Sequence, residues 1–154
     1  MKSGDELRRI LVVGYGNPLR TDDGAGTAAA ERIRALGIPG VEVRTAHQLV
    51  PEMAEDFVLY DAVVLVDAAV DGLPVSFFRV QHLRKGGTLS HHCDASLIAS
   101  LLAGLYRCNT PVYACTIRGE SFHLGEELTL PVKLRVSEAV DRIRSFIMEV
   151  MEYA

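Results

Sequence analysis

The stretch LVVGYGNPLRTDDGAG, from Leu11 to Gly26, decides how the chain begins to fold. Its first residues form an apolar run that ends in glycine, which is typical of a buried strand. The residues after Asp23 are small and favour a helix, and Gly37 marks the end of that helix. We therefore expect a strand, a loop and a helix in this order.

The loop of this stretch does not suit a phosphate. A dinucleotide-binding GxGxxG motif needs a third glycine at position 19, where the chain has Leu19, and no GKS or GKT of a Walker loop is present. A nucleotide-binding domain is therefore supported only by Gly14 and Gly16. Two alternatives remain for the carboxylates. Either Asp22 is a surface turn residue and Asp23 an ionised N-cap of the helix, or Asp23 belongs to a functional site and Asp22 holds the loop in shape.

Strands and helices alternate through the rest of the chain. The run DAVVLVDAA at 61–69 is apolar at nearly every position, which is typical of a strand buried on both faces of a mostly parallel sheet. The expected strands are 8–16, 41–49, 61–69, 75–83 at an edge, and 110–119; the expected helices are 24–37, 50–60, one within 88–107, and one that Pro131 opens. This order predicts a single domain over 1–154, an α/β three-layer sandwich whose mostly parallel, twisted sheet has about five strands and helices on both faces.

Composition excludes several classes of protein. A net charge of −4 over 154 residues offers no basic cluster for nucleic acid, and no apolar run approaches the roughly 20 residues of a membrane span. Charges among the first ten residues argue against a signal peptide. Cys93, Cys108 and Cys115 cannot all pair within one chain and form no CxxC motif, so we expect reduced, mostly buried thiols. These features predict a cytoplasmic monomer with neither nucleic acid nor membrane as a partner.

Asp67 closes the apolar run AVVLV within the expected strand of 61–69. A charge there is costly unless it faces the open crevice at the carboxyl end of the sheet. The alternative is an aspartate that is hydrogen-bonded to loop backbone. His91 and His92 precede the Leu-rich helix, which also starts at this end. Asp23, Asp67 and His91 can therefore converge at one crevice, and two carboxylates with one imidazole suit a divalent transition metal.

The other histidines are weaker candidates. His47 follows a strand and is kept as a possible crevice residue. His82 and His123 are expected to be solvated.

Four motifs of the chain resemble those of the hydrogenase maturation proteases. ILVVGYGNPLRTDDGAG resembles their N-terminal signature, in which a strand ending in G-x-G-N leads through an apolar loop to an acidic pair. VVLVDAAVDG resembles the second motif, a strand followed by Asp-Ala, and LSHHCDASLIASLL the third, a histidine that opens a Leu-rich helix. IRGESFHLGEELTLPVKLRVSEAVDRI resembles the closing loop and helix. The resemblance covers essentially the whole chain, with the motifs in the family's order.

The resemblance implies an endopeptidase that removes a short C-terminal extension from the large-subunit precursor of a nickel–iron hydrogenase, after nickel has been inserted. It places the family's catalytic and metal-contacting residues on Asp23, Asp67 and His91. His92 is adjacent, and a shift of one residue would exchange the two histidines, although His91 keeps the apolar helix better in register. Some members have Glu where this chain has Asp23, which shortens the reach by about one methylene, ~1.5 Å.

The resemblance also implies that the enzyme has no permanent cofactor of its own. Asp23, Asp67 and His91 would complete the coordination of nickel that the substrate's cysteines already hold. The nickel would polarise the scissile carbonyl or a water, and a carboxylate free of metal would act as general base. In a second version of the mechanism the metal is only checked, and a carboxylate performs the hydrolysis. The rival interpretation is an assembly factor that docks on the precursor and checks nickel loading without cleavage.

Overall fold

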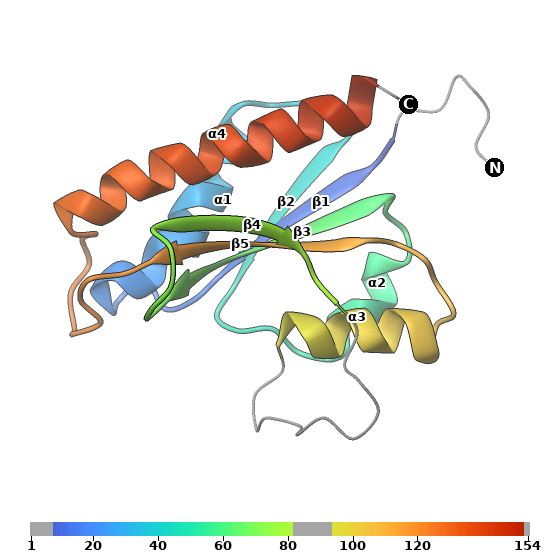
Figure 1. Cartoon of the computed structure of the whole chain (residues 1–154), viewed down its shortest axis with the longest axis horizontal. Helices are drawn as coiled ribbons and strands as arrows, with labels where there is room; N and C mark the ends of the chain where they lie inside the picture. The colour runs from blue at the N-terminus through green and yellow to red at the C-terminus, as the bar shows by residue number, and fades with distance from the viewer. Residues whose placement is uncertain (1–7, 82–93, 153–154) are drawn as a thin grey trace.

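Five strands form one mixed sheet in the order β2-β1-β3-β5-β4 (Figure 1). The structure is a computed structural model and describes residues 8–81 and 94–152. The strands are β1 (Ile10–Tyr15), β2 (Val41–Ala46), β3 (Ala62–Ala69), β4 (Val75–Arg79) and β5 (Val112–Arg118). Strands β2, β1, β3 and β5 are parallel, whereas β4 pairs antiparallel with β5 at the edge. The mostly parallel sheet with its edge strand is as predicted.

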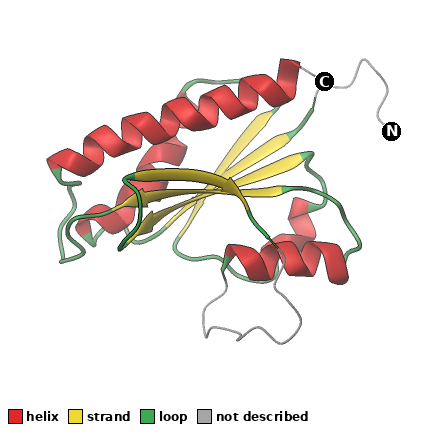
Figure 2. Ribbon diagram, in the orientation of Figure 1, coloured by secondary structure: helices red, strands yellow, loops and turns green. Residues whose placement is uncertain are grey.

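Helices cover both faces of the sheet and complete three layers (Figure 2). Helices α1 (Ala25–Ala35) and α4 (Leu130–Glu152) pack on one face, and α2 (Met53–Phe57) and α3 (Ala95–Gly104) on the other. Alternation along β1 supplies both cores, because successive side chains of a strand point to opposite faces. Ile10 and Val12 belong to the first core, and Leu11 and Val13 to the second. The predicted three-layer sandwich is confirmed.

Helix α4 is amphipathic, as its sequence predicts. Its second residue is Pro131, whose missing N–H costs nothing in the first turn. The predicted stripe is buried against β5 and α1, apart from the partly buried Val150; it consists of Val136, Val140, Ile143, Ile147 and Val150. Among the described residues, no helix is both long enough and apolar enough to cross a membrane.

Strand β1 marks the point at which the order of the sheet reverses. The chain passes from β1 through α1 to β2 on one side, and β3 then pairs on the other side of β1. Ligands of open α/β sheets bind at such a point, in the crevice beyond the carboxyl ends of the strands. The loop after β1 and the end of β3 border this crevice, and they carry Asp23 and Asp67.

Gly26 lets the start of α1 lie directly on the ends of β1 and β3. A Cβ at this position would lie 2.3 Å from the carbonyl oxygen of Val66 and 2.9 Å from that of Tyr15. Both obstacles are backbone atoms of the sheet. The helix therefore approaches this closely only because residue 26 has no side chain.

The Gly26→Ala variant is expected to lower the free energy of unfolding by about 1–3 kcal/mol, because its methyl group must push α1 away from the sheet. Gly104→Ala is the matched control, since a Cβ at Gly104 meets nothing within 4 Å. Urea unfolding of both variants measures the difference. Equal stabilities would contradict the tight contact.

Candidate functional site

Asp67 lies at the end of β3, on the face that α2 and α3 cover. Val63 and Leu65 pack into the core of this face, and Asp67 continues their alternation. Tyr15 lies at the end of the neighbouring strand β1, packs against the same core and hydrogen-bonds to Asp67 through its side chain. The carboxylate of Asp67 thus lies at the edge of this hydrophobic core, near the carboxyl ends of the parallel strands.

The pKa of Asp67 reflects this position. Burial raises it from the usual 3.8 to about 6, against the hydrogen bonds from the side chain of Tyr15 and the backbone of Ala68, which lower it. The negative charge of Asp23 contributes further to the raised pKa. The alternative of an aspartate that is hydrogen-bonded to loop backbone does not describe this bond, because Ala68 lies within β3.

Asp23 lies in a single turn of 3-10 helix, η1 (Thr21–Gly24), between the loop after β1 and α1. Its carboxylate Oδ2 accepts a hydrogen bond of 2.8 Å from the backbone N–H of Asn17. The loop folds back this tightly because Gly16 has a φ of 140° and no side chain, and a Cβ there would lie 2.1 Å from the carbonyl oxygen of Asp23. The expected N-cap is wrong: the turn η1 intervenes, α1 begins at Ala25, and Gly24 is its N-cap.

The structure brings Asp23 and Asp67 together. They come from segments 44 positions apart, and the charge of Asp23 acts on the pKa of Asp67. Asp67 follows the last paired position of β1 and β3, and Asp23 lies in the turn after β1, so both belong to the reversal point of the sheet. This is the crevice in which α/β sheets bind their ligands.

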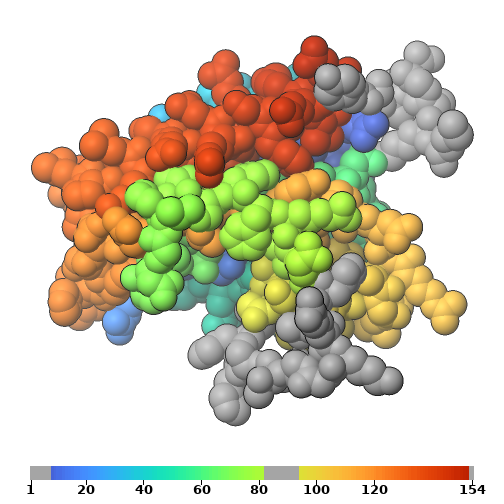
Figure 3. All heavy atoms as spheres, in the orientation of Figure 1, coloured from blue at the N-terminus to red at the C-terminus, as the bar shows by residue number. Residues whose placement is uncertain are grey.

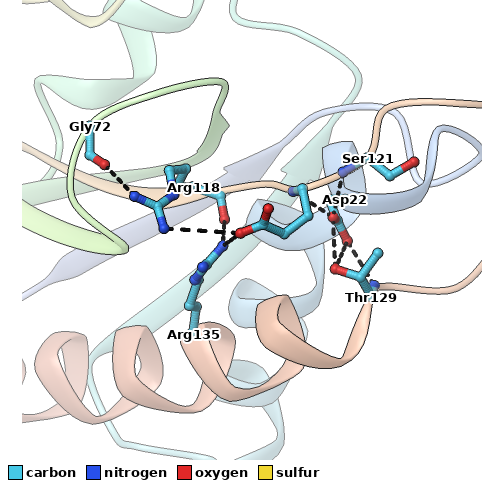
Figure 4. Close-up of polar contacts among 7 residues, drawn as sticks. Asp22, Gly72, Arg118, Ser121, Thr129 and Arg135 are labelled. Carbon is cyan, nitrogen blue, oxygen red and sulfur yellow. Dashed lines mark hydrogen bonds and ion pairs between the residues drawn. The ribbon is translucent and has the colours of Figure 1, made fainter.

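Asp22 is fully buried and binds the segment between β5 and α4 (Figure 4). Its Oδ2 accepts from the backbone N–H groups of Glu120 and Ser121 at 2.8 and 2.9 Å. Its Oδ1 accepts from the backbone N–H of Thr129 at 2.8 Å, and the Thr129 hydroxyl bonds to the same carboxylate. Burial raises the pKa of Asp22, but these hydrogen bonds outweigh it and hold the pKa below the usual 3.8. One alternative from the sequence, a surface turn residue, is therefore wrong, and the other, in which Asp22 holds the loop in shape, is confirmed.

An ion-pair network lies beside Asp22 and was not predicted (Figure 4). Arg135, in α4, approaches Glu120 within 2.7 Å and donates to the carbonyl oxygen of Arg118. Arg118 donates in turn to the carbonyl oxygen of Gly72. The turn between β3 and β4, the end of β5 and the start of α4 are thereby connected at the end of the sheet that carries the two site aspartates.

The histidine of the predicted site cannot be placed: His82, His91 and His92 lie outside the described residues, as does Cys93. Helix α3, which follows them, covers the face to which Asp67 belongs. Within 8–81 and 94–152, no three His, Cys, Asp or Glu side chains are arranged to hold a metal. The set of Asp23, Asp67 and His91 as metal ligands stays a prediction.

The exposure of the remaining candidate histidines and of two cysteines can be compared with the predictions. His47 follows β2 and is exposed, and His123 is exposed as expected. Cys115 is buried, and burial raises its pKa to about 12, so this thiol is not a nucleophile at neutral pH. Cys108 is partly buried and, like Cys115, free.

Comparison with known proteins places the fold. The chain matches no protein-family model and no curated protein. Among solved structures, it resembles the hydrogenase maturating endopeptidase HybD of Escherichia coli, with a TM-score of 0.70, 21% identity, and 92% of this chain and 93% of the other covered. It also resembles the hydrogenase maturation protease HycI of Thermococcus kodakarensis, with a TM-score of 0.69, 23% identity, and coverage of 96% and 95%.

A third similar structure is the hydrogenase 2 maturation peptidase of a Thaumarchaeota archaeon, with a TM-score of 0.65, 22% identity, and coverage of 93% and 97%. All three likenesses extend over nearly the full length of both chains. The resemblance that the sequence motifs indicated is confirmed for the fold. The chain therefore has the fold of the hydrogenase maturation endopeptidases.

Proposed function

We propose that this protein is an endopeptidase that removes the C-terminal extension of the nickel-loaded large-subunit precursor of a nickel–iron hydrogenase. The observation that carries the proposal is the meeting of Asp23 and Asp67 at the reversal point of the sheet. The fold adds support, because the similar structures of known type are hydrogenase maturation endopeptidases.

Asp23, Asp67 and His91 bind the nickel of the substrate in this proposal. Two carboxylates and one imidazole are donors that a divalent transition metal accepts. The backbone N–H of Asn17 fixes the Asp23 carboxylate through one oxygen, and the Tyr15 side chain bonds to Asp67. Such hydrogen bonds orient ligands before the metal arrives. A cation between the two aspartates would also relieve their mutual repulsion, which adds to the effect of burial on the pKa of Asp67.

Asp67 is the general base in the version of the reaction in which Asp23 and His91 hold the nickel and the Asp67 carboxylate stays free of metal. A carboxylate whose pKa burial has raised to about 6 is better suited to accept a proton near neutral pH than an ordinary aspartate. Asp67 removes a proton from water, and the water oxygen bonds to the carbonyl carbon of the scissile peptide. The C–N bond then breaks, and the departing nitrogen takes up a proton. The substrate's nickel polarises the carbonyl or the water.

The Asp23→Asn variant separates recognition from chemistry. If Asp23 contacts the nickel, the variant should bind the loaded precursor about 10-fold or more weakly, and cleavage should fall with binding. Binding is measured by titration of labelled precursor, and cleavage by its change in mass. Asp71→Asn is the matched control, an exposed aspartate in the turn after β3. Loss of cleavage with full binding would rule out a recognition-only role for Asp23, and full retention of both would remove it from the site.

A further inference from the structure

Two loops pair at the end of the sheet that carries the site. The N–H of Gly125 donates to the carbonyl oxygen of Leu19 at 2.9 Å, and the N–H of Thr21 donates to that of Gly125 at 2.8 Å. Arg20 and Gly125 form a parallel bridge. Leu19 and Leu124 each precede a residue of this bridge, so they are neighbours across the pair. Leu19 is 55% exposed and Leu124 83%.

Two further leucines lie at the start of α4. Leu130 and Leu134 are one helical turn apart and 76% and 75% exposed. We call Leu19, Leu124, Leu130 and Leu134 the leucine ridge. Large apolar side chains that are grouped and exposed mark interaction surfaces more often than isolated ones do.

Hydrogen bonds to Asp22 connect the segments that carry the ridge; we call these segments and Asp22 the frame. The carboxylate of Asp22 binds Ser121 and Thr129, which flank the segment that carries Leu124. Thr129 directly precedes Leu130, and Asp22 itself lies three residues after Leu19. Surfaces that are rigid before binding lose less entropy when a partner docks. The frame is also continuous with the site, because Asp23 follows Asp22 in the same turn.

The ridge and the site occupy one end of the molecule. Figure 1 shows the start of α1, the segment before α4 and the turn between β3 and β4 together at this end. In the space-filling view, the orange segment before α4 and the green turn between β3 and β4 lie at the same end (Figure 3). Leu19 lies in the same loop as Asp23, four residues before it, and Leu124 is its neighbour across the bridge, so this pair is the part of the ridge nearest the site. Leu130 and Leu134 belong to α4, which packs on the other face of the sheet from Asp67.

We infer that the leucine ridge is the surface on which an apolar patch of the precursor protein docks, next to the segment that is cleaved. The inference rests on the proposed function. Four leucines are too few for the roughly 800 Å² per partner of a standard stable interface, which favours a substrate that binds and leaves over a permanent second copy. The exposed Arg20, Glu126 and Glu127 add the polar rim that such surfaces have.

The double variant Leu19→Ser/Leu124→Ser tests the inference with the nickel-loaded precursor as the probe. We expect KM to rise about 10-fold or more, because two apolar contacts are lost, while kcat changes less than about two-fold. The melting temperature should not fall, since both side chains are exposed. The matched control is Leu36→Ser/Leu59→Ser, two exposed leucines that precede β2 and β3 at the opposite end of the sheet, and its KM should equal that of the wild type.

Each other outcome overturns the inference in a recognisable way. A wild type that cleaves, together with an unchanged KM of the ridge variant, overturns the ridge and leaves the proposed function intact. Sedimentation shows whether the wild type is a dimer that the ridge variant dissociates; with an unchanged KM, that result assigns the ridge to self-association instead. A wild type that neither binds nor cleaves the precursor overturns the proposed function, and the ridge inference with it.

Discussion

The Asp67→Asn variant is expected to cleave the precursor about 10²–10⁴-fold more slowly than the wild type, because an amide cannot accept the proton of the attacking water. The same variant should be more stable than the wild type at neutral pH. Both effects come from one cause, the position of this carboxylate at the edge of a hydrophobic core beside Asp23. A measured gain in stability would show that the loss of activity does not come from unfolding.

The stability effect has a definite sign. The pKa of Asp67 in the folded protein is about 6, above the usual 3.8 that it regains on unfolding. The folded state therefore keeps its proton more tightly, and stability falls as the pH rises between these two values. The cost is fully present above the folded pKa and absent below the unfolded one. Asparagine removes it, so the variant should gain about 1–3 kcal/mol at neutral pH.

Urea unfolding at neutral pH and at a pH below the unfolded pKa of 3.8 measures this gain. Asp71→Asn is the control for removal of an exposed charge. The advantage of Asp67→Asn should disappear in acid, where the wild-type carboxyl is protonated in both states. Equal stability at neutral pH would mean that Asp67 ionises normally. Undiminished cleavage would mean that another group is the base.

The Asp22→Ala variant is expected to lower the free energy of unfolding by about 3–5 kcal/mol, because the N–H groups of Glu120, Ser121 and Thr129 lose a charged acceptor inside the protein. This is a large part of the 5–15 kcal/mol that typically stabilises a domain. The pKa of Asp22 is lowered in the folded state. Its contribution is therefore present above the unfolded pKa and lost as the pH falls through the folded one.

Thr129→Val is a milder variant that removes only the side-chain hydrogen bond to Asp22. It removes the hydroxyl that bonds to Asp22 but keeps the backbone N–H, so the expected loss is about 1 kcal/mol. Thermal and urea unfolding give both values. A loss below about 1 kcal/mol for Asp22→Ala would show that water or another group replaces the carboxylate.

Features that depend on neighbouring residues in the chain could be predicted from the sequence. Periodicity located the strands and helices, and the apolar run that ends at Asp67 placed this residue at the carboxyl end of a central strand. The reversal of the sheet at β1 then brings Asp67 near the loop that carries Asp23. Topology rules of parallel sheets are enough for that step.

Other features depend on partners that no local pattern reveals. The groups that bind Asp22 lie 98 to 107 residues further along the chain, so its burial could not be read from its neighbours. The expected N-cap at Asp23 failed because this residue lies within a turn of 3-10 helix, and Gly24, the last residue of that turn, is the N-cap of α1. The network of Arg118, Glu120 and Arg135 likewise forms only once β5 and α4 have packed.

The most direct test of the account is the intact mass of a large-subunit precursor after incubation with the purified protein, measured with nickel-loaded and with nickel-free precursor. The account predicts that the loaded precursor becomes shorter by one C-terminal segment and that the nickel-free precursor keeps its mass. An unshortened loaded precursor, under conditions in which a known maturation endopeptidase cleaves it, would contradict the account and favour an assembly factor that docks without cleavage.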